Sequence, residues 1–481
     1  MDTEESAPPT VRLVGLIAGP LGAVLATTMA YGSLSHDAAL VVGLVTWMTV
    51  WWLTIAVDLA VTALLPVLLL PFLGISTFSQ AAAPYASDVI FLFGSGFVLA
   101  TALERYGLST RFAAVMLRLA GTRASAVVAA LMVTTAIISA FVSNTATAAA
   151  MLPVALAIAR AAKDVSDEGR QRLAAAATLG VAYGASIGGA FTLIGSPPNA
   201  IAARYVEGET QTALSFVGWL GYGLPIGLIL LPIAWFVLVR LVFPIRGVRL
   251  MHAVASVSRD RDAISQRGQY RVLAIFSATV LGWLSRPIWG GYVPAVSDAG
   301  IAIAGAVLLM TVPRSLSPYR PLLVWRELVG IPWGVLILFG GGLSLAAAID
   351  STGVAAALAN ALSPIAGWPI IAIILAIVAI ACFGSELASN TALAATAMPL
   401  IGAIAKSTGA PLAPLAVAAA LGASLAFMLP VGTPPNAMAF ATGHVRSGDM
   451  MKAGLILNLA SIVVITLVVV MRIAIGARLG I

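Results

Sequence analysis

The chain has 481 residues, of which 60% are hydrophobic and only 9% are charged, and its formal net charge is +7. A soluble domain carries about 25% charged residues, so most of this chain is expected to face lipid rather than water. The positive charge does not indicate a nucleic-acid partner, because the Lys and Arg residues stand in short connectors between apolar runs. The composition predicts an all-α, multi-pass membrane protein.

Apolar runs of the length that crosses a bilayer, about 20 residues, follow one another along the chain. Residues 1–36 hold an acidic tail and the first span, which we interpret as retained because a signal peptide begins with a basic region. The stretches 124–160 and 364–405 are broken at Ser-Asn-Thr and predict re-entrant hairpins, and those at 173–205 and 411–443 predict interrupted helices. The other spans are predicted at 11–33, 38–54, 59–75, 87–104, 212–239, 272–289, 299–313, 332–349 and 453–471.

These runs give about eleven crossings when each hairpin is counted as non-crossing, and basic residues then orient them. With the N-terminus in the cytoplasm and the C-terminus outside, every Arg-rich connector falls on the cytoplasmic side of the cell (inner) membrane, and Glu207, Glu209 and Asp298 fall on the other. The basic connectors contain Arg105, Arg111, Arg118, Arg123, Arg160, Lys163, Arg170, Arg172, Arg240, Arg246, Arg249, Arg259, Arg261, Arg267, Arg271, Arg314, Arg320 and Arg326.

The chain also resembles itself at nearly constant spacing. Phe93-Gly94-Ser95-Gly96 recurs as Phe339-Gly340-Gly341-Gly342. Ser143-Asn144-Thr145 recurs as Ser389-Asn390-Thr391, with the same number of residues between the two copies. We call this spacing the first offset. Gly195-Ser196-Pro197-Pro198-Asn199 recurs at a slightly shorter spacing, the second offset, as Gly432-Thr433-Pro434-Pro435-Asn436. The first copy therefore has nine extra residues, which we place in the charged loop 160–172.

An odd number of crossings separates the two copies, which predicts two repeats of opposite orientation, at 37–250 and 251–481. Inverted repeats are typical of secondary transporters, whose binding sites lie near the middle of the membrane on interrupted helices. Two related halves also give an inward-open and an outward-open state of similar energy.

The repeated polar motifs have the chemistry of such a site. Ser, Asn and Thr begin helices, and a helix that begins inside the membrane directs free N–H groups and partial positive charge at an anion. Their oxygens are also suitable ligands for a small cation. A Pro-Pro pair stops the preceding helix, so carbonyl groups of its last turn are expected to be free for a cation.

Several residues allow a simpler interpretation. One Ser-Asn-Thr alone is most simply a turn and one Pro-Pro a kink, but both recur in the same order. The repeated glycines indicate close helix packing. Glu386 is either a functional carboxylate inside the membrane or a structural hydrogen-bonding group. Asp58 fits a turn at the membrane surface, and His36, His252 and His444 receive no role.

No intramembrane Lys or Arg is expected near the motifs, so an anion there would need helix ends, neutral donors and co-bound cations. This indicates cation coupling. Sodium fits neutral oxygen ligands better than a proton relay, because a relay needs several titratable groups and only Glu386 is present. Two motifs related by symmetry match the two carboxylates of a C4 dicarboxylate such as succinate.

With these motifs the chain resembles the divalent anion–sodium symporters, the INDY-type di- and tricarboxylate transporters, from Trp51-Trp52 to Ala441-Thr442-Gly443. The family usually has a Glu and a Pro after Trp-Trp, where this chain has Ile55 and Asp58. The resemblance implies a homodimer with an elevator mechanism. It implies that the substrate contacts Asn144, Thr145, Ser196, Pro197, Asn390, Thr391, Thr433 and Pro434. It implies two sodium sites, one of Ser139, Ser143, Asn144 and Gly195 and one of Ser385, Ala388, Asn390 and Gly432.

Other functions remain open at this point. A sodium-independent dicarboxylate exchanger would use the same motifs, and sulfate is an alternative cargo. An ion channel is compatible with broken helices, although no continuous polar pore lining is visible. We expect no enzymatic activity, because the chain has no zinc-protease motif, phosphate-binding loop or nucleophile elbow.

Overall fold

The computed structural model describes residues 9–162, 166–245, 266–316, 319–365 and 367–479. Within these ranges, eight helices are long and apolar enough to cross a membrane, and five further apolar helices are shorter. The prediction of an all-α membrane protein is confirmed. Part of the longest basic connector, with Arg246, Arg249, Arg259, Arg261 and His252, lies outside the described residues, as do residues 1–8 of the acidic tail and Lys163.

The first half of the chain begins with two long helices that pack against each other and continues through short pieces to a hairpin and a broken helix. Its helices are α1 (Pro9–Ala30), α2 (His36–Thr54), α3 (Leu59–Thr62), α4 (Leu65–Phe72), α5 (Phe78–Ala82), a 3-10 turn (Ala83–Ala86), α6 (Asp88–Arg105), α7 (Leu108–Ala120), α8 (Ala124–Ser139), α9 (Asn144–Ala161), α10 (Asp167–Phe191), α11 (Pro197–Thr210) and α12 (Phe216–Phe236), which runs into a π-helical turn (Val237–Val242).

The second half repeats this order from α16 onward, where α16 to α22 follow one another as α6 to α12 do. It consists of α14 (Gln266–Trp289), α15 (Asp298–Thr311), the antiparallel strands β1 (Pro313–Leu316) and β2 (Tyr319–Pro321), a 3-10 turn (Trp325–Gly330), α16 (Trp333–Ser351), α17 (Val354–Ala361), a 3-10 turn (Ser363–Ile365), α18 (Ile370–Ser385), α19 (Asn390–Thr408), α20 (Leu412–Ser424), a 3-10 turn (Pro430–Gly432), α21 (Pro434–Ala441) and α22 (Ser447–Leu479).

Helix boundaries recur with the spacing of the sequence motifs. The starts of α17, α18 and α19 lie at the first offset from those of α7, α8 and α9 respectively, and α21 begins at the second offset from α11. The glycines that precede α7 and α17, Gly107 and Gly353, both have positive φ angles, of 60° and 84°. The two halves therefore share backbone conformation as well as sequence.

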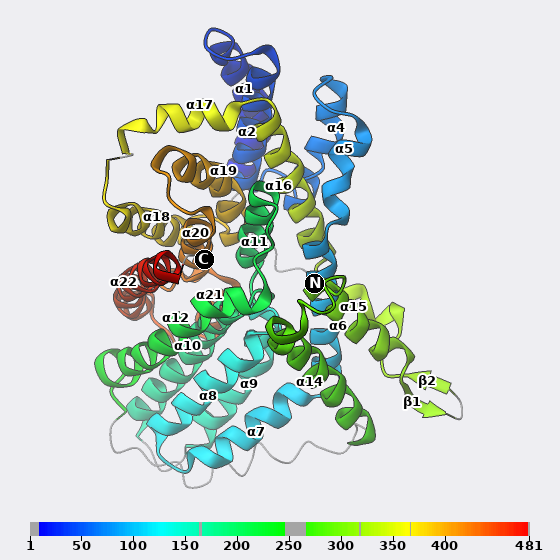
Figure 1. Ribbon diagram of the computed structural model, residues 1–481. Coiled ribbons are helices and arrows are strands. Elements are labelled where there is room, and N and C mark those ends of the chain that lie inside the picture. Colours follow the sequence, from blue (N-terminus) through cyan, green and yellow to red (C-terminus); the bar gives the residue numbers. More distant parts are fainter. Residues whose placement is uncertain (1–8, 163–165, 246–265, 317–318, 366, 480–481) are drawn as a thin grey trace.

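The two halves interlock around their broken helices (Figure 1). Within each half, the first piece of the broken helix packs on its own hairpin: α10 on α8 and α9, and α20 on α18 and α19. The second piece crosses over, because α11 packs on α19 and α20, whereas α21 packs on α9 and α10. In Figure 1 the α8–α9 hairpin lies low in the view and the α18–α19 hairpin above it, with α11, α20 and α21 between them.

Both hairpins and both interrupted helices form where the sequence predicts them, and three other details differ. The predicted span 59–75 is broken after Thr62, where Ala63 and Leu64 separate α3 from α4, and it ends near Gly74, whose φ is 75°. The basic stretch after Arg105 contains the helix α7, and its copy contains α17. The β1–β2 hairpin was not predicted.

The nine extra residues of the first half are only partly a loop. At the second offset, the first residue of α20, Leu412, corresponds to position 175 of the first half. Because α10 begins earlier, at Asp167, it has about two additional turns at its start. The charged residues Asp167, Glu168, Arg170 and Arg172 therefore lie on a helix that begins at Asp167, with Ser166 as its cap. The predicted loop 160–172 is wrong in this part.

Candidate functional site

A cavity of about 720 Å³ brings together all four repeated motifs. Both Ser-Asn-Thr tips and both Pro-Pro segments line it, although they come from α9, α11, α19 and α21. Ten of the predicted site residues line the cavity: Ser143, Asn144, Thr145, Gly195, Ser196, Pro197, Asn390, Thr391, Thr433 and Pro434. The other four predicted residues, Ser139, Ser385, Ala388 and Gly432, are not among its lining residues.

At the tip of the first hairpin, Ser143 caps α9 because its hydroxyl accepts a hydrogen bond from the backbone N–H of Ala146, at 3.2 Å. The Ser139 hydroxyl lies behind the tip, 2.7 Å from Oδ1 of Asn144 and 2.8 Å from the carbonyl oxygen of Ala185. The Ser139 hydroxyl has only one proton to donate, so the oxygens of Ser139, Asn144 and Ala185 together offer more hydrogen-bond acceptors than donors. Such an oxygen cluster fits a small cation.

The second tip has the same backbone but a different hydrogen-bond pattern. Asn390 begins α19 as Asn144 begins α9, yet Ser389 makes no side-chain cap bond. Oδ1 of Asn390 is buried and has no hydrogen-bond partner among the described residues. The Ser385 hydroxyl donates to the carbonyl of Cys382 within its own helix, at 2.9 Å. The second tip therefore holds an unused buried oxygen, which is a free ligand position.

The proline pairs restart the broken helices at the cavity. Pro197 and Pro434 are the first residues of α11 and α21, where a proline's missing N–H and fixed φ suit the first turn. The prediction that the carbonyls before each break are free is wrong for four of them. Asn199 donates its amide to the carbonyls of Gly189 and Thr192, at 2.8 and 2.9 Å, and Asn436 donates to those of Ala426 and Leu429, both at 3.2 Å.

Glycines let these segments approach one another closely. A Cβ atom on Gly189 would lie 2.3 Å from Oδ1 of Asn144, and one on Gly195 would lie 2.6 Å from the carbonyl oxygen of Gly189. In the second half, a Cβ atom on Gly432 would lie 2.7 Å from Oε2 of Glu386. A side chain at Gly189 or Gly432 would push a hairpin tip away from its broken helix, and one at Gly195 would force apart the two sides of the first helix break.

The glycines of the Phe-Gly motifs support the packing hypothesis only in part. Gly340 and Gly341 allow close contact, because added Cβ atoms would lie 2.2 Å from Tyr85 and from the Ala63 carbonyl respectively. Gly342 faces open space, so close packing is wrong as its explanation. The phenylalanines of the two motifs, Phe93 and Phe339, contact each other edge to face with ring centres 5.4 Å apart.

Glu386 is buried, with 3% of its surface exposed, and connects the second hairpin to the second helix break. Its carboxylate accepts hydrogen bonds from the backbone N–H groups of Phe427, Met428 and Leu429, at 2.7, 2.8 and 2.9 Å. The amide of Asn458 on α22 donates a fourth bond, at 2.7 Å. The structural role that the sequence left open for Glu386 is therefore confirmed.

Sequence reasoning missed several residues of the cavity. Arg12, from the start of α1, lines the same cavity as the motifs, so the expectation that no basic residue would be near them is wrong. Asp58 also lines it and caps α3 by accepting from the N–H of Ala60, at 2.6 Å. Apolar lining comes from Phe93, Phe97, Ile194, Pro332 and Trp333, among others. Apart from Phe93, which belongs to a repeated Phe-Gly motif, no local pattern marks these residues, because they approach the Ser-Asn-Thr and Pro-Pro motifs only in the folded chain.

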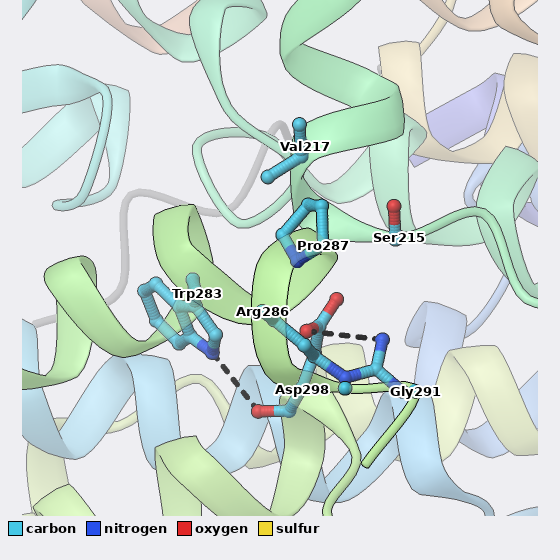
Figure 2. A pocket seen from close by; sticks show the side chains of 8 residues that line it. Ser215, Val217, Trp283, Arg286, Pro287, Gly291 and Asp298 are labelled. Atoms are coloured by element: carbon cyan, nitrogen blue, oxygen red, sulfur yellow. Dashed lines mark hydrogen bonds and ion pairs between the residues drawn. The ribbon is translucent and has the colours of Figure 1, made fainter. Parts of the chain in front are cut away.

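A second, smaller cavity of about 320 Å³ lies where α12, α14 and α15 meet, and contains none of the repeated motifs (Figure 2). Asp298 organises it: one oxygen accepts from the N–H of Phe216 at 2.8 Å, and the other lies 3.4 Å from Arg286. The indole of Trp283 donates to the Asp298 carbonyl at 2.9 Å and its ring stacks on Phe216. We interpret this cluster as a structural junction, because its charged groups are paired with each other.

Helical spans, two hairpins and two helix breaks around a cavity lined by all four polar motifs form the architecture of a membrane transporter. The family model described as citrate transporter matches residues 49–422. Two curated relatives, both named sodium-dependent dicarboxylate transporter SdcS, are 35% identical. The protein of Staphylococcus saprophyticus aligns over 95% of this chain and 91% of its own length, and that of Staphylococcus aureus strain RF122 over 97% and 92%.

The chain therefore belongs to the citrate transporter family and, with these relatives, to the divalent anion–sodium symporters that its repeated motifs indicated. The fold is also similar to that of a solved structure, the YdaH transporter of Alcanivorax borkumensis. The TM-score is 0.58 with 16% identity, and the match covers 85% of this chain and 89% of that one.

Proposed function

We propose that this transporter moves a C4 dicarboxylate, such as succinate, together with sodium ions across the cell membrane. The observation that carries the proposal is the convergence of both Ser-Asn-Thr tips and both Pro-Pro helix starts on one cavity. Helix N-termini attract anions, and two pairs of them match a substrate with a carboxylate at each end. The relatives' name, sodium-dependent dicarboxylate transporter, supports the same substrate and ion.

In this proposal the substrate contacts are Asn144, Thr145, Ser196, Pro197, Asn390, Thr391, Thr433 and Pro434. The two sodium sites keep their predicted residues: Ser139, Ser143, Asn144 and Gly195 in the first half, and Ser385, Ala388, Asn390 and Gly432 in the second. The oxygen cluster at Ser139 and the unpartnered oxygen of Asn390 support cation binding at these two places. Sodium would supply positive charge that the repeated motifs lack.

We further propose that the hairpins and broken helices move together against the remaining helices, as in an elevator, within a homodimer whose chains have a cytoplasmic N-terminus. The packing of α8–α12 with α18–α22 supports one moving body, because these helices contact each other across the two halves. Inverted repeats at 37–250 and 251–481 would give this body two equivalent end positions.

Arg12 favours one alternative. A guanidinium in the cavity gives fixed positive charge, which reduces the need for a co-bound cation, so a sodium-independent dicarboxylate exchanger is the second candidate. Uptake of radiolabelled succinate into proteoliposomes separates the two. We expect uptake into empty vesicles that is driven by an inward sodium gradient and is absent in choline. Counterflow that is equally fast in sodium and in choline, with no uptake into empty vesicles, would contradict symport and support the exchanger.

A further inference from the structure

The tip of each hairpin is tied to the helix break of its own half, but the two ties differ in charge. In the first half, the Thr192 hydroxyl donates to the carbonyl of Ala140. Position 140 corresponds to Glu386 at the first offset, and position 192 corresponds to Leu429 at the second. There the backbone N–H of Leu429 donates to Oε2 of Glu386, at 2.9 Å. One half therefore uses a neutral hydroxyl and carbonyl where the other uses a carboxylate.

The hydrogen-bond partners of Glu386 are those of an ionised carboxylate. The four bonds to its oxygens all come from N–H donors, three on the backbone and one on the Asn458 side chain. The second half therefore contains a fixed negative charge, whereas position 140 of the first half is an alanine.

This charge lies beside the proposed second sodium site. Glu386 stands between Ser385 and Ala388 in the sequence, and its Oε2 is 2.7 Å from the place a Cβ atom on Gly432 would take. These three neighbours are, with Asn390, the residues proposed to bind the second sodium ion. A negative charge at this position attracts a cation to the second site and has no counterpart at the first.

The asparagine side-chain oxygens of the two proposed sites also differ in whether they already have a hydrogen-bond partner. Oδ1 of Asn144 lies 2.7 Å from the Ser139 hydroxyl, whose one proton it shares with the Ala185 carbonyl, so a cation at the first site must compete for a partly used oxygen. Oδ1 of Asn390 is buried without a partner among the described residues, so a cation at the second site displaces nothing there. An unmade hydrogen bond at a buried oxygen costs free energy, which a bound cation would recover.

We propose that the cation site of the second half binds sodium more tightly than that of the first and fills first, and that Glu386 is the positioning residue and fixed charge responsible. This inference rests on the proposed sodium coupling. The carboxylate acts without coordinating the ion: it holds the segment 427–429 against the hairpin tip and adds negative charge to the site.

The experiment is a sodium titration of the purified protein in detergent, followed by thermal unfolding, with choline keeping the ionic strength constant. A ligand that binds the folded state raises the melting temperature, so the sodium midpoint reports binding without transport. Glu386→Gln removes the charge, keeps an acceptor for three of the four donors, and places an amide against the N–H of Leu429. Sodium-dependent succinate uptake in proteoliposomes gives a parallel readout.

Asn458→Ala is the matched control. It removes a donor to Glu386 and an acceptor for the Phe427 N–H, and so loosens the same segment without changing charge. We expect Glu386→Gln to raise the sodium midpoint at least about tenfold and Asn458→Ala to raise it by less than about threefold. Glu386→Asp keeps the charge and should stay within about threefold of wild type. Equal shifts in Glu386→Gln and Asn458→Ala, or an unchanged midpoint in Glu386→Gln, would overturn the proposal.

A second pair of variants tests the order of filling even if Glu386→Gln does not fold. Ser385→Ala should raise the sodium concentration at which stabilisation begins, whereas Ser139→Ala should alter only the response at higher sodium. The reverse pattern overturns the proposal. If the wild-type protein itself responds equally to sodium and choline, the proposed sodium coupling has failed, and this outcome differs from a sodium response that Glu386→Gln leaves unchanged.

Discussion

The first hairpin with its broken helix (α8 to α11) and the second (α18 to α21) reach the same cavity with closely matching backbones. Both tips begin a helix at an asparagine, both breaks restart at a proline pair, and in both an asparagine after the prolines bonds two carbonyls of the break. The polar contacts behind the tips are different. The first half joins Ser139 to Asn144, whereas the second half leaves Asn390 open and adds Glu386.

This comparison shows which parts of the site must be alike in the two halves and which parts can differ between them. The backbone of a tip and a break must match for two halves to interlock, because α11 and α21 each pack on the other half's hairpin. Among the described residues, the hydrogen bonds of Ser139 and Glu386 stay within their own half, so these side chains can differ. The proposed substrate site, shared by both halves, and the two proposed cation sites of unequal affinity match this division.

The largest expected effect concerns stability. It distinguishes the Glu386 contacts of the second half from the Thr192–Ala140 hydrogen bond of the first half. Glu386→Ala leaves three backbone N–H groups and the Asn458 amide without this acceptor, and should lower the free energy of unfolding by about 3–5 kcal/mol. Thr192→Val removes one donor from the Ala140 carbonyl and should cost about 1–2 kcal/mol. Denaturant unfolding in mixed micelles measures both. Equal losses would show that the two ties are equivalent after all.

The next effect concerns binding, and here the halves should behave alike. Thr145→Ala and Thr391→Ala each remove one hydroxyl donor to a charged carboxylate, so each should weaken succinate binding by about 1.5–3 kcal/mol. Thr396→Ala is the control, since the Thr396 hydroxyl bonds to the carbonyls of Ala392 and Leu393 in its own helix. Wild-type succinate affinity in both cavity variants would remove these threonines from the site.

The asparagines after the proline pairs should give a smaller and graded effect. Asn199→Ala removes bonds of 2.8 and 2.9 Å, and Asn436→Ala removes two of 3.2 Å, so we expect losses of about 2 and about 1 kcal/mol in unfolding free energy. Asn360→Ala, at an exposed position on α17, should change stability very little and serves as the control. A larger loss at Asn436 than at Asn199 would contradict this ranking.

The sequence predicted those parts of the site that have a local cause. Ser, Asn and Thr favour the start of a helix and a proline pair suits its first turn, so the hairpins and breaks could be located from neighbouring residues alone. Three of the four partners of Glu386 could not, because they are backbone N–H groups 41 to 43 residues away, and a backbone group leaves no mark in the sequence. The break after Thr62 did have a local signal, because Pro66 stands in the first turn of α4, but the prediction of one continuous span did not use it.

Arg12 lies outside both halves and gives the smallest expected effect. Since it is an exposed cation that lines the cavity, Arg12→Gln should weaken succinate binding several-fold at low ionic strength and much less at high ionic strength. Arg12→Lys should restore most of the affinity. Titrations at two ionic strengths provide the measurement. A loss that is the same at both would show that Arg12 binds the substrate directly instead of attracting it.

The central claim is that both halves hold one dicarboxylate together with sodium. Equilibrium titration of the purified protein with succinate and with sulfate, each in sodium and in choline, tests it most directly. The account predicts that succinate binds at least about tenfold more tightly in sodium than in choline, and more tightly than sulfate, which is too small to reach both tips. Equal succinate affinity in the two salts, or tighter binding of sulfate, would contradict it.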